Sequence, residues 1–338
     1  MKTLATLAAA ACLSLAGCWS ASGPEVVVYS ALDREFSEPI LKDFEKEEGV
    51  TVRPVYDVES TKTVGLTNRI IEEAALPQCD LFWNNEILNT LRLQKEGLLE
   101  VYRSPFAESY PEMAKSPKGT WHGFAARARV LIVNTEKLSE DERPSSILDL
   151  TKPKWRGRCG IAKPLFGTTA SHAACLFAHW GDEEAKDFFL KLKENDVKIL
   201  SGNKQVAIQV AGGQIDFGLT DTDDAIIEVE QGRPVAIVYP DQGEGEMGTL
   251  FIPNTLAIIR GGPNPEQARK LVDWLLRPEI ESRLAAGPSA QIPLNPECDA
   301  EVRVATPRTI RAMQVDFDAA AEKWDTAAAF LREELAGG

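Results

Sequence analysis

The chain has 338 residues, of which 44% are hydrophobic and 26% are charged, and its formal net charge at pH 7 is -14. This composition is typical of a folded globular protein that can bury one large core or two medium ones. An acidic chain without a basic stripe excludes nucleic acid as a partner, because nucleic-acid binders gather Lys and Arg on one face.

The N-terminus predicts an export signal over residues 1–17. A basic start at Lys2 precedes the short apolar run 4–15, which is too short to span a bilayer as a helix of the mature protein. The ending Leu-Ala-Gly before Cys18 resembles the bacterial lipobox, which implies that Cys18 carries lipid and that 18–24 is a tether. The alternative is an ordinary secretory signal with a chance Cys at its end. The lipidated form predicts a protein of the periplasm or cell surface, anchored to a membrane.

Short apolar runs then alternate with segments of helical spacing. The predicted strands are 26–29, 50–56, 79–83, 124–134, 159–162, 217–220, 235–239 and 250–259. The predicted helices are 35–47, 62–75, 88–96, 168–180, 182–195, 205–212, 223–230, 265–276, 278–286 and a tail from Thr306, as its cap, to Leu335. This alternation predicts βαβ units and parallel sheet.

The predicted fold class is α/β, with two lobes joined by a hinge and a ligand cleft between them. Two long extended runs cross from one half to the other, and ligands of open α/β sheets bind beyond the carboxyl ends of the strands. We expect lobe 1 to comprise 25–126 and 255–290, and lobe 2 to comprise 127–254. The remainder, 291–338, is expected to be a helical segment that packs on the lobes.

Three carboxylates crowd the start of one predicted helix, at Asp221, Asp223 and Asp224. Capping alone would explain any one of them, because carboxylates are favoured at helix N-termini. Three in four residues exceed what capping needs, and crowded like charges repel unless a cation or donors compensate them. With Asp33 and Glu86 from the other lobe, they predict an oxygen-rich site for a hard metal cation or an organic ammonium group.

A feature of opposite sign lies at Gly167, Thr168 and Thr169, where another helix begins. Glycine allows close approach, and the hydroxyl and N–H groups suit an oxyanion, to which Arg127 would add a bidentate contact. The alternative is a plain Thr cap and an Arg paired with a surface acid. Trp83 follows a strand and could lie in the cleft or in the core, and we expect the cleft because a polar loop follows it.

Four thiols remain after the signal, namely Cys79, Cys159, Cys175 and Cys298. In an oxidising compartment they could form two disulfides, and the alternative is that they are buried thiols. No close Cys spacing suggests a metal site.

From about Val26 to Pro296 the order of segments resembles the extracellular solute-binding proteins of bacterial ABC importers, specifically the ferric-ion-binding branch. The residues that carry the resemblance are 28–29, 80–83, 127–130, 202–203, 212–219 and 293–296. The resemblance implies an iron site with a His or carboxylate in the first lobe and two adjacent tyrosines in the second. It also implies a synergistic anion held by an Arg and a helix N-terminus.

Matched residue by residue, the first-lobe ligand falls at Asp33, and the next carboxylate position falls at Asn85 or Glu86. The tyrosine pair falls at Asp223 and Asp224, which is a departure from the branch. The predicted ligand-binding residues are Tyr29, Asp33, Trp83, Asn85, Glu86, Arg127, Gly167, Thr168, Thr169 and Asn203. The predicted metal ligands are Asp33, Asp221, Asp223 and Asp224.

The resemblance implies a monomeric binding protein that captures a small solute and delivers it to an inner-membrane ABC permease. The expected solute is iron(III) or another metal or cation, with an accompanying anion and no catalytic cofactor. The alternatives are an organic cation or a phosphorylated or anionic solute, a cleft enzyme, or a scaffold or sensor. The sequence shows no nucleophile elbow, zinc-protease helix or P-loop, so we expect no enzyme.

Overall fold

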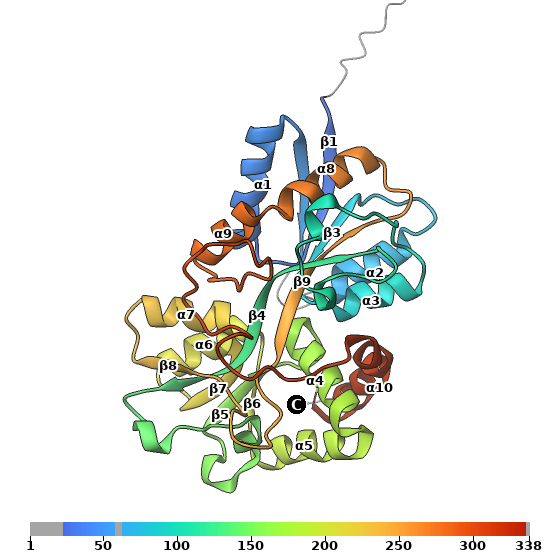
Figure 1. The fold of residues 1–338 in the computed structure, drawn as a ribbon. Helices are drawn as coiled ribbons and strands as arrows, with labels where there is room; N and C mark the ends of the chain where they lie inside the picture. The colour runs from blue at the N-terminus through green and yellow to red at the C-terminus, as the bar shows by residue number, and fades with distance from the viewer. Residues whose placement is uncertain (1–22, 58–62, 336–338) are drawn as a thin grey trace, which may run out of the picture.

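The computed structural model describes residues 23–57 and 63–335 (Figure 1), so Cys18 and the predicted signal lie outside the described residues. The strands are β1 (Glu25–Ser30), β2 (Thr51–Tyr56), β3 (Leu81–Asn84), β4 (His122–Asn134), β5 (Cys159–Ala162), β6 (Lys198–Leu200), β7 (Phe217–Asp221), β8 (Val235–Val238) and β9 (Phe251–Ile258). The helices are α1 (Arg34–Glu48), α2 (Val64–Glu72), α3 (Leu88–Lys95), α4 (Gly167–Trp180), α5 (Asp182–Glu194), α6 (Asn203–Ala211), α7 (Thr222–Glu230), α8 (Pro265–Leu275), α9 (Pro278–Ala286) and α10 (Phe317–Leu335).

Two lobes share one mixed sheet with the strand order β2-β1-β3-β9-β4-β7-β5-β6, and β8 pairs with β4. The strands β1, β2 and β3 pair in parallel in the first lobe, as β5, β6 and β7 do in the second. Between them, β4 and β9 pair antiparallel and run from one lobe to the other (Figure 1). The predicted two-lobed α/β fold is therefore confirmed.

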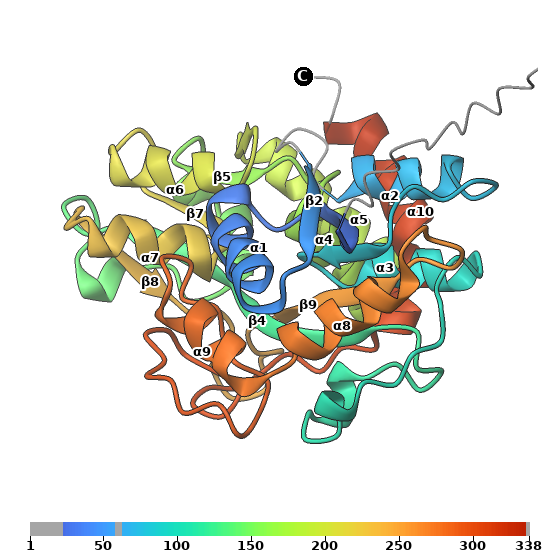
Figure 2. The ribbon, with the colours of Figure 1, turned by 90° about the horizontal axis from the view of Figure 1, so that it is seen from above.

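Helices cover both faces of the sheet in each lobe. In the first lobe, α1, α8 and α9 pack on one face and α2 and α3 on the other, and Figure 2 shows this separation from above. In the second lobe, α6 and α7 cover one face, whereas α4 and α5 cover the other together with α10. Because both faces are covered, β3, β4, β5, β7 and β9 are buried along their whole length.

The crossing strands carry a local irregularity. The register of β4 against β9 shifts between Phe124 and Ala126, and Ala125 between them has a φ of 43°. The backbone N–H of Ala125 donates to the buried Glu281 carboxylate of α9, with an N···O distance of 2.5 Å. A β-bulge bends a strand, so β4 changes direction where it leaves the first lobe. The lobe boundaries given above stay a prediction.

The C-terminal helix begins later than the sequence predicted. Thr306 accepts a hydrogen bond from the N–H of Arg308 and closes only a local turn, and α10 starts at Phe317. The capping side chain is that of Asp316, which accepts from the N–H of Ala319 at 3.0 Å. The prediction was wrong because a Thr-Pro pair suits a turn as well as a helix start.

The sequence left open whether the four later cysteines form disulfides or are buried thiols, and in the described residues all four are free thiols. Cys79, Cys159 and Cys175 are buried, and burial raises the pKa of the Cys159 thiol to about 12. These thiols are packing residues, as the alternative expectation held.

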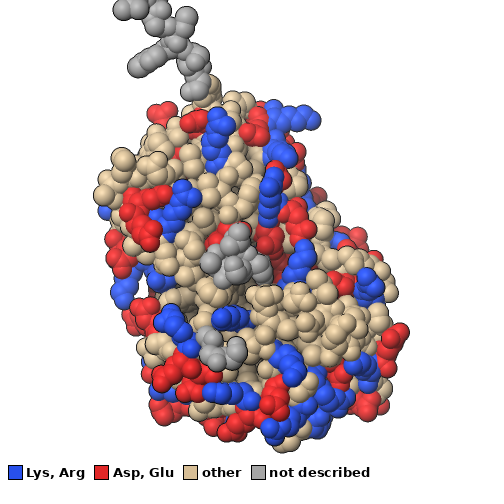
Figure 3. Space-filling model, turned by 180° about the vertical axis from the view of Figure 1, so that it is seen from behind, with Lys and Arg blue, Asp and Glu red and all other residues tan. Residues whose placement is uncertain are grey.

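Within residues 23–57 and 63–335, no helix is long and apolar enough to cross a membrane. Basic and acidic side chains are mixed over the face drawn in Figure 3.

Candidate functional site

A pocket lies where α4 and α6 begin, beyond the carboxyl end of β5. It is lined by Asn85, Ala162, Lys163, Phe166, Gly167, Thr168, Thr169, Ser201, Gly202 and Asn203. Phe166 and Gly202 occupy the N-cap positions in extended conformation, and neither makes a side-chain capping bond. The first N–H groups of both helices therefore remain available to an anion. Gly167 has a φ of 55°, a backbone conformation that glycine tolerates best.

One lining residue comes from the first lobe. Asn85 follows β3, is 1% exposed, and its Oδ1 atom has no hydrogen-bond partner among the described residues. A buried acceptor left without a donor is costly, so this atom is suited to a donor supplied by a ligand. Lys163 is the charged residue of the lining and is half-buried. Neither Lys163 nor Ser201 was predicted, because both lie in short segments without a motif.

A buried ion pair holds the two helix starts together. Arg129 is fully buried, and its Nη1 lies 2.7 Å from Oδ1 of Asp221. The same guanidinium donates to the side-chain oxygens of Thr168, Thr169 and Asn203 at 3.1 to 3.2 Å. The other Asp221 oxygen accepts from Thr168 Oγ1 at 2.5 Å and from Asn203 Nδ2 at 2.9 Å. The pair therefore fixes the pocket residues and adds no net charge.

A second buried pair lies beside it, at the crossing strands. Arg127 Nη1 is 3.1 Å from Asp223 Oδ2, and Arg127 Nη2 donates to Asn254 Oδ1 of β9 at 3.0 Å. Gln291 links the two acceptors, since it accepts from Asn254 and donates to Asp223. Burial alone would lower the pKa of Arg127, but Asp223, with further carboxylates nearby, outweighs it and raises that pKa.

This arrangement corrects the assignment of the arginines. The sequence predicted that Arg127 would meet the threonines of α4, whereas the structure places Arg129 against them. Both side chains lie on one face of β4, because residues i and i+2 of a strand point the same way. That alternation was the signal that could have identified Arg129.

The predicted carboxylate group is present, with ligand atoms of Asp221, Asp223 and Asp224 within 4.8 Å of one another. Two of the three form the buried ion pairs with Arg129 and Arg127. A metal ion would have to compete with both guanidinium groups. The geometry therefore opposes a dedicated metal cage, and the metal-ligand assignment, with Asp33 included, stays a prediction.

Three other residues were predicted to bind the ligand, but their side chains contact other parts of the protein; they are Trp83, Tyr29 and Glu86. Trp83 was expected to face the cleft, but it is fully buried in the first-lobe core and packs on Phe124 at a centroid distance of 5.5 Å. Parallel strand β3 is covered on both faces, so a residue at its end enters the core. The hydroxyl of Tyr29 donates to Glu73, the C-cap residue of α2.

Glu86 was predicted to face the aspartates of α7, but its carboxylate has other partners. Its carboxylate accepts from the N–H groups of Leu88 and Asn89 at the start of α3, and from the hydroxyl of Ser171 of α4 at 2.6 Å. Lys204 of α6 and Glu35 of α1 form an ion pair of 2.8 Å. Both contacts join the two lobes next to the pocket.

Residues 79–323 match the model of the family described as bacterial extracellular solute-binding protein. The major ferric iron-binding protein of Neisseria meningitidis is 25% identical over 306 residues, which cover 88% of this chain and 89% of that protein. The iron uptake protein A1 of Synechocystis is 27% identical over 77% of this chain and 73% of that protein.

Solved structures show the same fold. Iron-bound HitA from Pseudomonas aeruginosa has a TM-score of 0.83 and 23% identity, over 92% of this chain and 99% of that chain. AfuA from Actinobacillus pleuropneumoniae, solved with fructose-6-phosphate, also has a TM-score of 0.83 and 23% identity, over 94% and 100% of the two chains. The same fold thus occurs in one protein solved with iron and in another solved with a sugar phosphate.

Proposed function

Because the chain belongs to the family of bacterial extracellular solute-binding proteins, we propose that its pocket captures a small solute through a doubly charged oxyanion group, such as a phosphate ester or a phosphonate. The observation that carries this proposal is the pair of uncapped helix starts, α4 and α6, that converge on one pocket with Lys163.

The charges of the pocket support a dianion. Each helix N-terminus contributes about +0.5 elementary charge, and Lys163 adds a full charge, so the total is about +2. A phosphate monoester carries about -1.5 to -2 at pH 7. The Arg129–Asp221 pair sums to zero and serves to hold Thr168, Thr169 and Asn203 in place. A carboxylate carries only one negative charge, so it would leave about half of the positive charge of this pocket without a counter-charge.

The remainder of the solute would meet the first-lobe side of the pocket. The buried Oδ1 atom of Asn85 has no donor among the described residues. This acceptor suits a hydroxyl or ammonium group of the solute.

A metal ion with a synergistic anion is the second candidate. The names of the relatives in Neisseria and Synechocystis support it, as does the grouping of three aspartates. The buried pairing of Asp221 and Asp223 with arginines, and the aspartates in place of tyrosines, favour the organic solute.

Calorimetric titration of the purified protein separates the two candidates. We expect binding of at least one among glycerol 3-phosphate, glucose 6-phosphate and 2-aminoethylphosphonate, and none of Mn²⁺ or iron(III) citrate. Lys163→Met should weaken that binding at least tenfold, whereas Lys198→Met, which alters an exposed lysine outside the lining, should not. Tight iron binding with no response to phosphorylated compounds would reverse the assignment.

Membership of the family supports an ABC permease as the partner, and the lipobox-like ending at Cys18 supports a lipid anchor as the means of attachment. Both belong to the proposal, as does the monomeric state.

A further inference from the structure

The C-terminal helix α10 is fixed to the second lobe. It packs along α4 and α5, and two ion pairs join it to α5. Lys323 lies 2.8 Å from Asp182, and Lys193 lies 3.1 Å from Glu334. Any movement of the second lobe therefore carries α10 with it.

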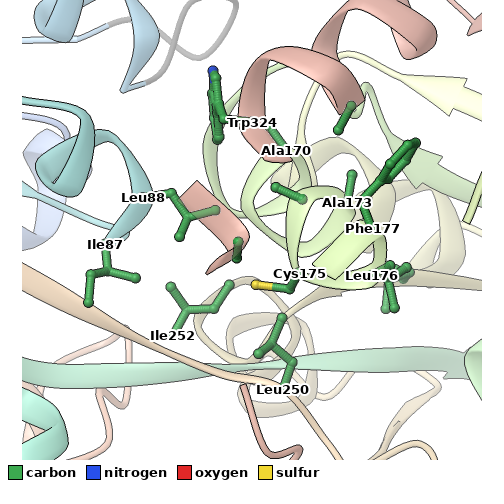
Figure 4. Close-up of a cluster of buried hydrophobic side chains, with 14 of the residues drawn as sticks. Ile87, Leu88, Ala170, Ala173, Cys175, Leu176, Phe177, Leu250, Ile252 and Trp324 are labelled. Carbon is green, nitrogen blue, oxygen red and sulfur yellow. The ribbon is translucent and has the colours of Figure 1, made fainter. Parts of the chain in front are cut away.

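The same helix also touches the first lobe, through α3. The Arg92 guanidinium of α3 lies 5.5 Å from the ring centroid of Trp324, which is only 6% exposed. Figure 4 shows Leu88 of α3 in the same apolar cluster as Trp324 and the α4 side chains Ala170 and Ala173. The core is thus continuous between the two lobes at this point.

The contact between α3 and α10 is linked to the pocket through the start of α3. Two of the three residues before α3 are Asn85, which lines the pocket, and Glu86, which accepts from Ser171 of α4. Helix α3 therefore contacts the second lobe at its start through α4 and further along through α10. A rotation that withdraws Asn85 from the pocket must also separate α3 from α10, because α10 is fixed to α4.

We propose that α10 is a strap that grips α3 and favours the closed arrangement of the lobes before any solute arrives. Burial of Trp324 between the lobes stabilises that arrangement without a contribution from the ligand. The apparent affinity of a binding protein falls by the fraction of molecules that are competent to bind, so the strap raises affinity through the closed population. The proposal does not depend on the chemistry of the solute.

Small-angle X-ray scattering of the mature chain, without added solute, tests this proposal. Arg92→Ala and Trp324→Ala should both increase the radius of gyration relative to the parent protein. The matched control is Lys323→Ala, which removes an ion pair within the second lobe on the same helix and should leave the radius unchanged. Circular dichroism checks that each variant is folded. If Trp324→Ala does not fold, the folded Arg92→Ala variant alone tests the proposal.

Equal radii for the parent, the control and a folded Arg92→Ala variant would overturn the proposal. The proposal would also be overturned if the scattering of the parent protein without solute fits separated lobes, because α10 would then not favour the closed arrangement. A failure to bind phosphorylated compounds would affect the proposed function and leave this result intact.

Discussion

At the scale of single residues, the Arg129–Asp221 pair is the most consequential feature of the site. Both side chains are almost fully buried, and together they hold the side chains at the starts of α4 and α6. A buried ion pair need not stabilise a protein more than apolar residues of similar volume would. Removing one partner is nevertheless costly, because the other charge then remains buried without a counter-charge. Its role is to position the pocket.

Asp221→Asn should therefore lower the free energy of unfolding by about 3–5 kcal/mol, since Arg129 loses its counter-charge. Urea denaturation measures the loss. Glu183→Gln is the control, because its ion pair with Lys186 is exposed and such pairs contribute at most about 1 kcal/mol. A loss no larger than that of the control would show that Arg129 is compensated in another way.

Cys18 is the residue on which the proposed membrane attachment depends. Cys18→Ser should prevent lipidation, so that the protein either appears in the soluble fraction or keeps its signal uncleaved. Fractionation with mass spectrometry of the N-terminus measures both. Persistent membrane attachment of a variant whose signal has been removed would refute the lipid anchor.

At the scale of elements, the sequence predicted long amphipathic segments well and short or locally capped ones poorly. The predicted helix 278–286 has the observed bounds of α9, and 35–47 differs from α1 by one residue at each end. The three-residue strand β6 is too short to show a period of two, and it was missed. Thr306 was mistaken for the cap of α10 because only the folded chain shows which side chain reaches the helix start.

The true cap gives an element-scale prediction. Asp316→Ala should cost about 1 kcal/mol of stability, because an N–H group in the first turn of α10 loses its acceptor. Thr306→Ala should have a smaller effect, since its hydroxyl closes a separate exposed turn. Thermal unfolding of the two variants tests the order, and a larger effect at Thr306 would contradict the assigned helix start.

The connection between β8 and β9 carries a titrating group. Burial raises the pKa of Asp241 from 3.8 to about 6, although Ser146 donates to its carboxylate. The folded chain thus binds this proton more tightly than the unfolded chain, so the contribution of Asp241 to stability decreases as pH rises from about 4 to about 6. Relative to Asp241→Asn, the parent protein should gain about 1 kcal/mol between pH 7 and pH 5 in urea denaturation. A pH-independent difference would exclude this titration.

At the scale of the whole molecule, the sequence predicted the two lobes and the general place of the site but not its internal pairing. The strand ends that carry Asp33, Asn85 and Asp221 could be ranked as site positions from topology alone. Which arginine meets which aspartate depends on the register of β4 against β7, where Arg129 pairs with Asp221. Register is a tertiary property, and a single sequence did not reveal it.

The two lobes should nevertheless unfold together. Strand β4 pairs with β9 and also with β7, so it joins the two halves of the sheet. One apolar cluster contains Leu91 of the first lobe with Phe177 of the second and Leu331 of α10. Unfolding one lobe alone would expose this shared surface, so the intermediate should be poorly populated. Calorimetry should give a single transition whose van't Hoff and calorimetric enthalpies agree, with coincident circular dichroism and tryptophan fluorescence curves. Two separable transitions would mean that the shared strands and α10 do not couple the lobes.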